Sequence, residues 1–259
     1  MKELIVDHSH WGQIRVTGED RVRFLQGMCT SNIETLGEGQ WVRTSLLSVK
    51  GRLVSVFEVI NRGDHHMLVC EPQLAAKTIE TLGKYAIIDD VVFESSTGPL
   101  HRVWPDAASV WTAAPIFAEP SGPVATADDV ETRRIEAGLP SYGVDVSEDY
   151  FPFEGPLDRH IDYEKGCYIG QEPVARVQAR GSANKYLRAL VVDGPGELEV
   201  GASLSHPDKD KAGSVTSAAV SEDFGVIALA YVHKAASEPG TEVSVAGRRA
   251  VVRELPLVP

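Results

Sequence analysis

The stretch "KGCYIGQEPVAR", which begins at Lys165, places a single thiol between two glycines in a charged setting. A cysteine attacks, binds metal or is oxidised as the thiolate, so its chemistry depends on how that form is stabilised. Cys167 follows a lysine and precedes residues 169–181, a helical pattern in which Pro173 fits the first turn. A cation and a helix N-terminus favour a thiolate, whereas a carboxylate such as that of Glu172 opposes it. These residue types therefore leave Cys167 open as a reactive thiol or as a structural residue in a tight turn.

A basic cluster follows the thiol. Arg176 and Arg180 are four residues apart and share one helical face, and Lys185 comes soon after. One interpretation is a solvated helix face with local ion pairs. The other is a site for carboxylates or phosphates, which arginine binds through two parallel hydrogen bonds.

The charge balance limits the partners of the chain. Its 259 residues include 25 Lys and Arg against 37 Asp and Glu, for a formal net charge of −12. Proteins that bind DNA or RNA directly carry a basic surface, so this balance argues against such a partner. No apolar run approaches the roughly 20 residues that span a bilayer, and the N-terminus has no apolar core of a secretory signal. We expect a cytoplasmic protein without a membrane partner.

Three cysteines, Cys29, Cys70 and Cys167, lie far apart in the sequence. Their odd number and wide spacing argue against a disulfide framework and against a closed zinc site. Cys29 and Cys70 adjoin apolar residues and are expected to be small buried side chains. We therefore expect no metal site in this chain.

The elements that must position these residues indicate an α+β body, residues 1–184, followed by a β-barrel, residues 185–259. The body combines strand-like runs with helices, and we expect Thr17 to cap a helix that ends at Gly27. Residues 95–130 are rich in Ser, Pro, Ala and Gly, so they indicate a reduced middle region with short strands at "HRVW" and "SVWTA". After residue 185, short apolar runs alternate with turns, which is typical of a small closed barrel.

The octapeptide "KGCYIGQE" resembles the signature of the YgfZ family, folate-binding proteins of iron–sulfur cluster assembly and repair. The likeness extends to "WGQIRVTGEDRVRFLQGMCTSNI", to "SVKGRLVSVFEV" and to the stretches on both sides of the signature. That family is similar in fold to the aminomethyltransferase, or T-protein, of glycine cleavage. The resemblance implies a folate-binding α+β body with a central cavity and a C-terminal β-barrel.

The resemblance also implies a ligand and a site. Tetrahydrofolate is the expected ligand, and Cys167 is the expected essential thiol. Trp11 matches a position where the family places an aromatic residue near folate, and an indole there either stacks on the ligand or packs in the core. From their charge, the basic cluster suits the glutamate tail. The expected cofactor-binding residues are Trp11, Lys165, Tyr168, Gln171, Glu172, Arg176, Arg180 and Lys185.

Two departures leave open whether the chain is an enzyme. The aminomethyltransferases carry an acidic residue where this chain has Cys167, in a pattern like K-G-D-F-I-G-K-E. They also carry a middle-domain R-T-G-Y-T-G-E-D-G motif, and nothing similar occurs between residues 95 and 130.

Three hypotheses follow. The first is a folate-dependent accessory protein that serves iron–sulfur client or assembly proteins through Cys167. The second is a one-carbon transferase that uses tetrahydrofolate, which needs an acid or base in the cavity. The third is a folate-binding regulatory module without chemistry. An unreactive Cys167 would favour this hypothesis.

Overall fold

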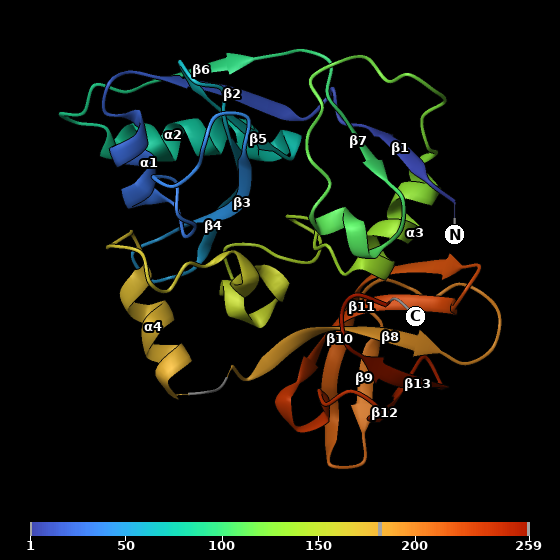
Figure 1. The fold of residues 1–259 in the computed structure, drawn as a ribbon. Helices are drawn as coiled ribbons and strands as arrows, with labels where there is room; N and C mark the ends of the chain where they lie inside the picture. The colour runs from blue at the N-terminus through green and yellow to red at the C-terminus, as the bar shows by residue number, and fades with distance from the viewer. Residues whose placement is uncertain (1, 181–182, 258–259) are drawn as a thin grey trace.

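The computed structural model describes residues 2–180 and 183–257, and for residues 178–180 it describes the backbone only. Its body holds a five-stranded antiparallel sheet in the order β3-β4-β5-β2-β6, with α1 and α2 against one face (Figure 1). The strands are β2 (Gly12–Thr17), β3 (Trp41–Leu47), β4 (Leu53–Asn61), β5 (His66–Cys70) and β6 (Val92–Ser96), and the helices are α1 (Arg21–Met28) and α2 (Ala75–Tyr85).

Side chains alternate between the two faces of this sheet, and both faces are covered. Ile14, Leu68 and Val59 lie opposite one another on β2, β5 and β4, and they share one apolar cluster with Leu25 of α1 and Leu82 of α2. Because successive residues of a strand point to opposite faces, the neighbours of these residues point away from the helices. That second face faces the middle region of the chain and forms the floor of the site described below.

The middle region adds a second, small sheet. Strand β1 (Leu4–Asp7) pairs with β7 (His101–Trp104), which confirms the strand expected at "HRVW". The strand expected at "SVWTA" is wrong, because Ala108–Trp111 form a 3₁₀ turn. In this turn the Trp111 indole is buried and donates to the carbonyl of Ala137, the last residue of α3 (Ala127–Ala137), at 2.7 Å.

The expected ends of the first helix also need correction. Thr17 is the last residue of β2, where it pairs with Val92, and α1 begins at Arg21. Asp20 precedes the helix without capping it, since its carboxylate accepts the backbone N–H of Asp90 instead. The helix continues past Gly27 to Met28.

The C-terminal part is a closed barrel in the order β10-β11-β8-β13-β12-β9, as expected. Its strands are β8 (Lys185–Val192), β9 (Ser203–His206), β10 (Lys209–Ser221), β11 (Gly225–His233), β12 (Glu242–Val245) and β13 (Arg248–Arg253). Helix α3 packs on its outer face, where Ile135 joins Leu187 and Leu229 in a buried cluster (Figure 1). The α+β fold with a reduced middle region and a C-terminal barrel is thus confirmed, while the division after residue 184 stays a prediction.

Short 3₁₀ turns and one further helix connect these parts. The turns are Pro72–Leu74, Pro152–Glu154, Pro156–His160 and Lys234–Ala236, and the helix is α4 (Gln171–Arg180), with Pro173 in its first turn as expected. Across the described residues, every helix is too short or too polar to cross a bilayer.

Candidate functional site

A cavity of 420 Å³ lies on the face of the sheet that α1 and α2 leave free. Its walls come from β3, β4 and β5, from β1 and β7, from α3, and from residues 139–141. Cavities of about 300–1,000 Å³ hold ligands of cofactor size. The middle region therefore contributes one wall of this cavity despite its reduced length.

Three charged side chains cross the floor of the cavity. Arg43 of β3 lies directly opposite Glu58 of β4, and Arg102 reaches the same carboxylate from β7. Arg43 Nη2 lies 2.8 Å from Glu58 Oε1, and Arg102 Nη2 lies 2.6 Å from Glu58 Oε2. Burial alone would raise the pKa of Glu58, but the charges of Arg102 and Arg43 outweigh it and lower that pKa. Glu58 is therefore an ionised, completely enclosed carboxylate shared by two guanidinium groups.

His8 completes this cluster. Arg102 Nη1 donates to His8 Nδ1, and a ring nitrogen that accepts a hydrogen bond carries no proton. Burial, together with the charge of Arg102, holds the pKa of His8 well below its ordinary value. The imidazole is neutral, so the cluster of Arg43, Arg102, Glu58 and His8 carries one net positive charge.

The cluster leaves hydrogen-bond donors unmatched. Arg43 Nη1, Arg102 Nε and Trp104 Nε1 are buried and find no acceptor within the described part of the chain, and all three residues line the cavity. A buried donor without an acceptor costs about 1–3 kcal/mol. These three donors at the cavity wall are therefore free to pair with an acceptor atom that is not part of the described chain.

Trp11 lines the same cavity next to this cluster. The ring centroid of Trp11 lies 4.2 Å from that of His8 and 5.1 Å from Arg102 Cζ. The indole is half-buried, so part of its surface remains free to contact a ligand. Of the residues expected to bind the cofactor, Trp11 lines the cavity.

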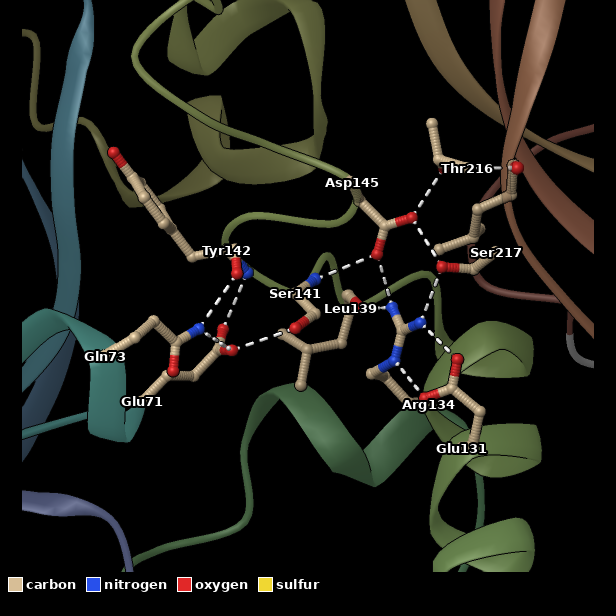
Figure 2. Close-up of polar contacts among 11 residues, drawn as sticks. Glu71, Gln73, Glu131, Arg134, Leu139, Ser141, Tyr142, Asp145, Thr216 and Ser217 are labelled. Carbon is tan, nitrogen blue, oxygen red and sulfur yellow. Dashed lines mark hydrogen bonds and ion pairs between the residues drawn. The ribbon is translucent and has the colours of Figure 1, made fainter. Parts of the chain in front are cut away.

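Glu71 contributes a carboxylate to another part of the cavity wall, and its contacts are drawn in Figure 2. The Glu71 carboxylate accepts the hydroxyl of Ser141 and the backbone N–H of Tyr142, each at 2.8 Å. Glu71 and Ser141 both line the cavity. Carboxylate oxygens accept hydrogen bonds only, so this part of the wall suits N–H donors of a ligand.

A buried ion pair links the cavity wall to the barrel (Figure 2). Arg134 of α3 lies 2.6 Å from Asp145, which is wholly buried. Asp145 also accepts the hydroxyls of Thr216 and Ser217 on β10. The geometry of the cavity is therefore tied to the position of the barrel.

Cys167 lies elsewhere. Its side chain is exposed, and residues 158–176 contribute nothing to the lining of the cavity. The loop that carries it is firmly held, because Lys165 buries its ammonium and donates to the carbonyls of Gln26, Cys29 and Ser31 at 2.7–2.8 Å. Since its three donors are used in this way, Lys165 acts as an anchor for the loop. The structure thus presents the thiol to solvent, apart from the cavity.

The remaining residues of the expected cofactor set, as far as the structure describes their side chains, do not line the cavity. Tyr168 is buried beside Lys165, and Gln171 begins α4. Glu172 pairs with Arg176 at 2.6 Å on an exposed helix face, which fits the interpretation of local ion pairs. Lys185 Nζ lies 4.1 Å from the ring centroid of Tyr150, and the side chain of Arg180 lies outside the described residues.

The sequence did carry a signal for the residues that were missed. Arg43, Glu58 and Arg102 interrupt the apolar runs "WVRTSLL", "LVSVFEVIN" and "HRVW". A charge inside a buried strand is costly unless it is paired, so each of these three residues indicates a buried partner.

The fold defines the class of the protein. A crystal structure of the glycine cleavage system aminomethyltransferase T from Bartonella henselae matches it with a TM-score of 0.84 at 21% identity, covering 99% of this chain and 86% of that one. Residues 185–258 match the family described as the glycine cleavage T-protein C-terminal barrel domain. The chain therefore has the aminomethyltransferase T fold.

Relatives define the chain more closely. The tRNA-modifying protein YgfZ of Yersinia enterocolitica is 26% identical over 72% of this chain and 69% of its own length. A chloroplastic protein of Arabidopsis thaliana, named as a candidate transferase, is 26% identical over 93% of this chain and 68% of its own. The chain is thus YgfZ-like, as the resemblance of its signature implied.

Proposed function

We propose that this chain binds a tetrahydrofolate in the cavity between the sheet and the middle region. The observation that carries the proposal is the wall of unmatched N–H donors on Arg43, Arg102 and Trp104 beside the Trp11 indole. A reduced folate joins a pterin, whose planar pyrimidine ring an indole can contact, to carbonyl and carboxylate oxygens that accept hydrogen bonds. The Glu71 carboxylate supplies acceptors for the amino and amide N–H groups of the pterin.

We further propose that folate binding serves the assembly or repair of iron–sulfur clusters in client proteins, with Cys167 as the thiol. The support is the contrast among the cysteines, because Cys167 is exposed on an anchored loop while Cys29 and Cys70 are buried. Iron–sulfur cluster sites take several cysteine ligands, so a single thiol suits a transient interaction with a client or an assembly protein. The proposal places this work in the cytoplasm, with neither a membrane nor a nucleic acid as a partner.

A one-carbon transferase is the second candidate, and the aminomethyltransferase T fold is the observation that favours it. Its chemistry would take place in the cavity, apart from Cys167. A turnover assay with aminomethyl or N-methyl donors and tetrahydrofolate distinguishes it from the first candidate. A folate-binding regulatory module is the third, and it requires neither turnover nor Cys167.

Two measurements test the proposed function. Titration with tetrahydrofolate, followed by calorimetry, should show one site that Trp11→Ala weakens and Cys167→Ala leaves intact. Complementation of a deletion strain should fail with Cys167→Ala and succeed with Cys70→Ala at equal protein levels. Equal rescue by wild type and Cys167→Ala would contradict the role of the thiol. A wild-type chain without affinity for tetrahydrofolate would contradict the proposed ligand.

A further inference from the structure

The cluster at the floor of the cavity holds a positive charge that the protein does not neutralise. Arg43 and Arg102 share the single carboxylate of Glu58, and their side chains are 7% and 1% exposed. His8 adds no charge, because its Nδ1 accepts from Arg102. An uncompensated charge inside a protein is costly, so such a group is retained where something else supplies the opposite charge.

Neighbouring acids do not supply it. Asp7 is exposed and accepts the backbone N–H of Ser9, while Glu131 pairs with Arg134 at 2.6 Å. Glu71 lies two strands across the sheet from Arg43 and two residues further along the chain direction. Ordinary sheet spacings place their Cα atoms roughly 12 Å apart. It is also satisfied locally by Ser141 and Tyr142.

Nearby aromatic rings do not supply an acceptor either. Arg43 Cζ lies 5.2 Å from the ring centroid of Trp111, and Arg159 Cζ lies 4.3 Å from the same centroid. A ring face attracts a cation but offers no oxygen to an N–H donor. Arg43 Nη1 thus stays without an acceptor within the residues described.

We propose that Arg43, Arg102 and Trp104 form an oxyanion subsite at the floor of the cavity, which takes a carboxylate of the ligand. The inference rests on the proposed function where that carboxylate is the glutamyl tail of folate. The same chemistry would hold a separate small carboxylate, such as an amino acid, beside the folate. In both cases the group brings a negative charge and several lone pairs to a site with one spare positive charge and three spare donors.

The subsite differs from the site that the sequence indicated for the same group. Arg176, Arg180 and Lys185 were expected to bind the glutamate tail from their charge alone. Arg176 is exposed and already pairs with Glu172. Arg43 is buried, where an ion pair is far less screened by solvent and salt.

The test is calorimetric titration with three probes, tetrahydrofolate, tetrahydropteroate and p-aminobenzoylglutamate. Tetrahydropteroate lacks the glutamate and ends in a benzoate carboxylate, which is nearer the pterin than the glutamyl carboxylates are. p-Aminobenzoylglutamate lacks the pterin. The variants are Arg43→Gln and Arg43→Lys, with Arg62→Gln as an exposed control. Trp104→Phe removes one spare donor without touching Glu58, so it remains informative if Arg43→Gln fails to fold.

If the tail occupies the subsite, the wild type should bind tetrahydrofolate at least tenfold tighter than tetrahydropteroate. Arg43→Gln should abolish that difference, Arg43→Lys and Trp104→Phe should reduce it, and Arg62→Gln should keep it. If a separate carboxylate occupies the subsite, glycine should tighten folate binding in the wild type and in Arg62→Gln but not in the Arg43 variants.

The subsite is overturned if tetrahydrofolate binds the wild type but Arg43→Lys and Trp104→Phe bind all probes like the wild type, with or without glycine. That result leaves the proposed function standing. Conversely, binding of p-aminobenzoylglutamate that depends on Arg43, in a chain without affinity for tetrahydrofolate, would support the subsite and contradict the proposed function.

Discussion

Lys165 donates a hydrogen bond from its buried ammonium to the carbonyl of Cys29 at 2.7 Å, and this contact fixes the thiol loop to the end of α1. Two further carbonyls, of Gln26 and Ser31, accept from the same ammonium. Within the loop, Lys165 and Tyr168 are buried while Gly166 and Cys167 between them are exposed. The exposure of Cys167 is thus a consequence of anchors on both sides of it.

Replacing this anchor should destabilise the protein. In Lys165→Met three carbonyls lose a charged donor, and we expect the free energy of unfolding to fall by more than about 3 kcal/mol. Urea unfolding measures the change. Lys50→Met is the matched control, since Lys50 is exposed on the β3–β4 turn and should give a change within about 0.5 kcal/mol. Similar losses in both variants would contradict the anchoring role.

Gly170 should tolerate no side chain. Its φ is +82°, and a Cβ there would lie 2.5 Å from the carbonyl oxygen of Ser48 on the β3–β4 turn. We expect Gly170→Ala to lower the melting temperature by several degrees and to loosen the thiol loop, seen as faster amide exchange in residues 163–170. Gly166→Ala is the control, because open space surrounds Gly166. Equal melting temperatures for the two variants would refute this argument.

Cys167 should account for the fast thiol chemistry of the native chain. Burial raises the pKa values of Cys29 and Cys70 to about 12, and both side chains are shielded from solvent. A disulfide reagent should therefore modify one thiol quickly in the wild type and none in Cys167→Ser, while denaturation releases the others. Rapid modification of the native Cys167→Ser chain would show that a second thiol is accessible.

Asp145 should hold the barrel against the body. It is fully buried, and it pairs with Arg134 while accepting the hydroxyl of Ser217 at 2.7 Å. Asp145→Asn leaves Arg134 with Glu131 as its carboxylate partner and removes the buried one, so we expect the free energy of unfolding to fall by about 1.5–3 kcal/mol. Urea unfolding tests this against Asp149→Asn, a change at an exposed carboxylate four residues away. An equal, small effect of both substitutions would count against the link between cavity wall and barrel.

Acid should destabilise the fold through His66. Burial and the nearby Arg21 lower the pKa of His66 to about 4, so the unfolded chain binds a proton below about pH 6.5 that the folded chain binds only near pH 4. Stability is therefore lost as the pH falls from about 6.5 to 4, by up to about 3 kcal/mol from this residue. His66→Phe should flatten that part of the profile measured by urea unfolding. An unchanged slope in the variant would exclude His66 as the cause.

Local patterns were sufficient for much of the fold. Apolar runs such as the one around Val59 predicted strands of the sheet from their β-branched and aromatic residues, and Pro173 lies in the first turn of α4 as expected. Gly138, with its φ of +69°, ends α3. The expected start of α1 was wrong because Thr17 is the last residue of β2, where it pairs with Val92 of β6. A Thr that could cap a helix can equally end a strand, and the distant pairing partner decides between the two.

The sequence by itself determined the class of fold, the barrel and the presence of a lone thiol in a recognisable signature. It could not decide that Trp11 borders the cavity while Cys167 lies outside it, or that Arg43, Glu58 and Arg102 meet. The physical reason is that a charge within an apolar strand is stable only beside its partner, and that partner comes from another strand through the register of the sheet and the packing of β7. The sequence indicates that such charges need buried partners but does not say which residues those are, so the tertiary structure assembled the site.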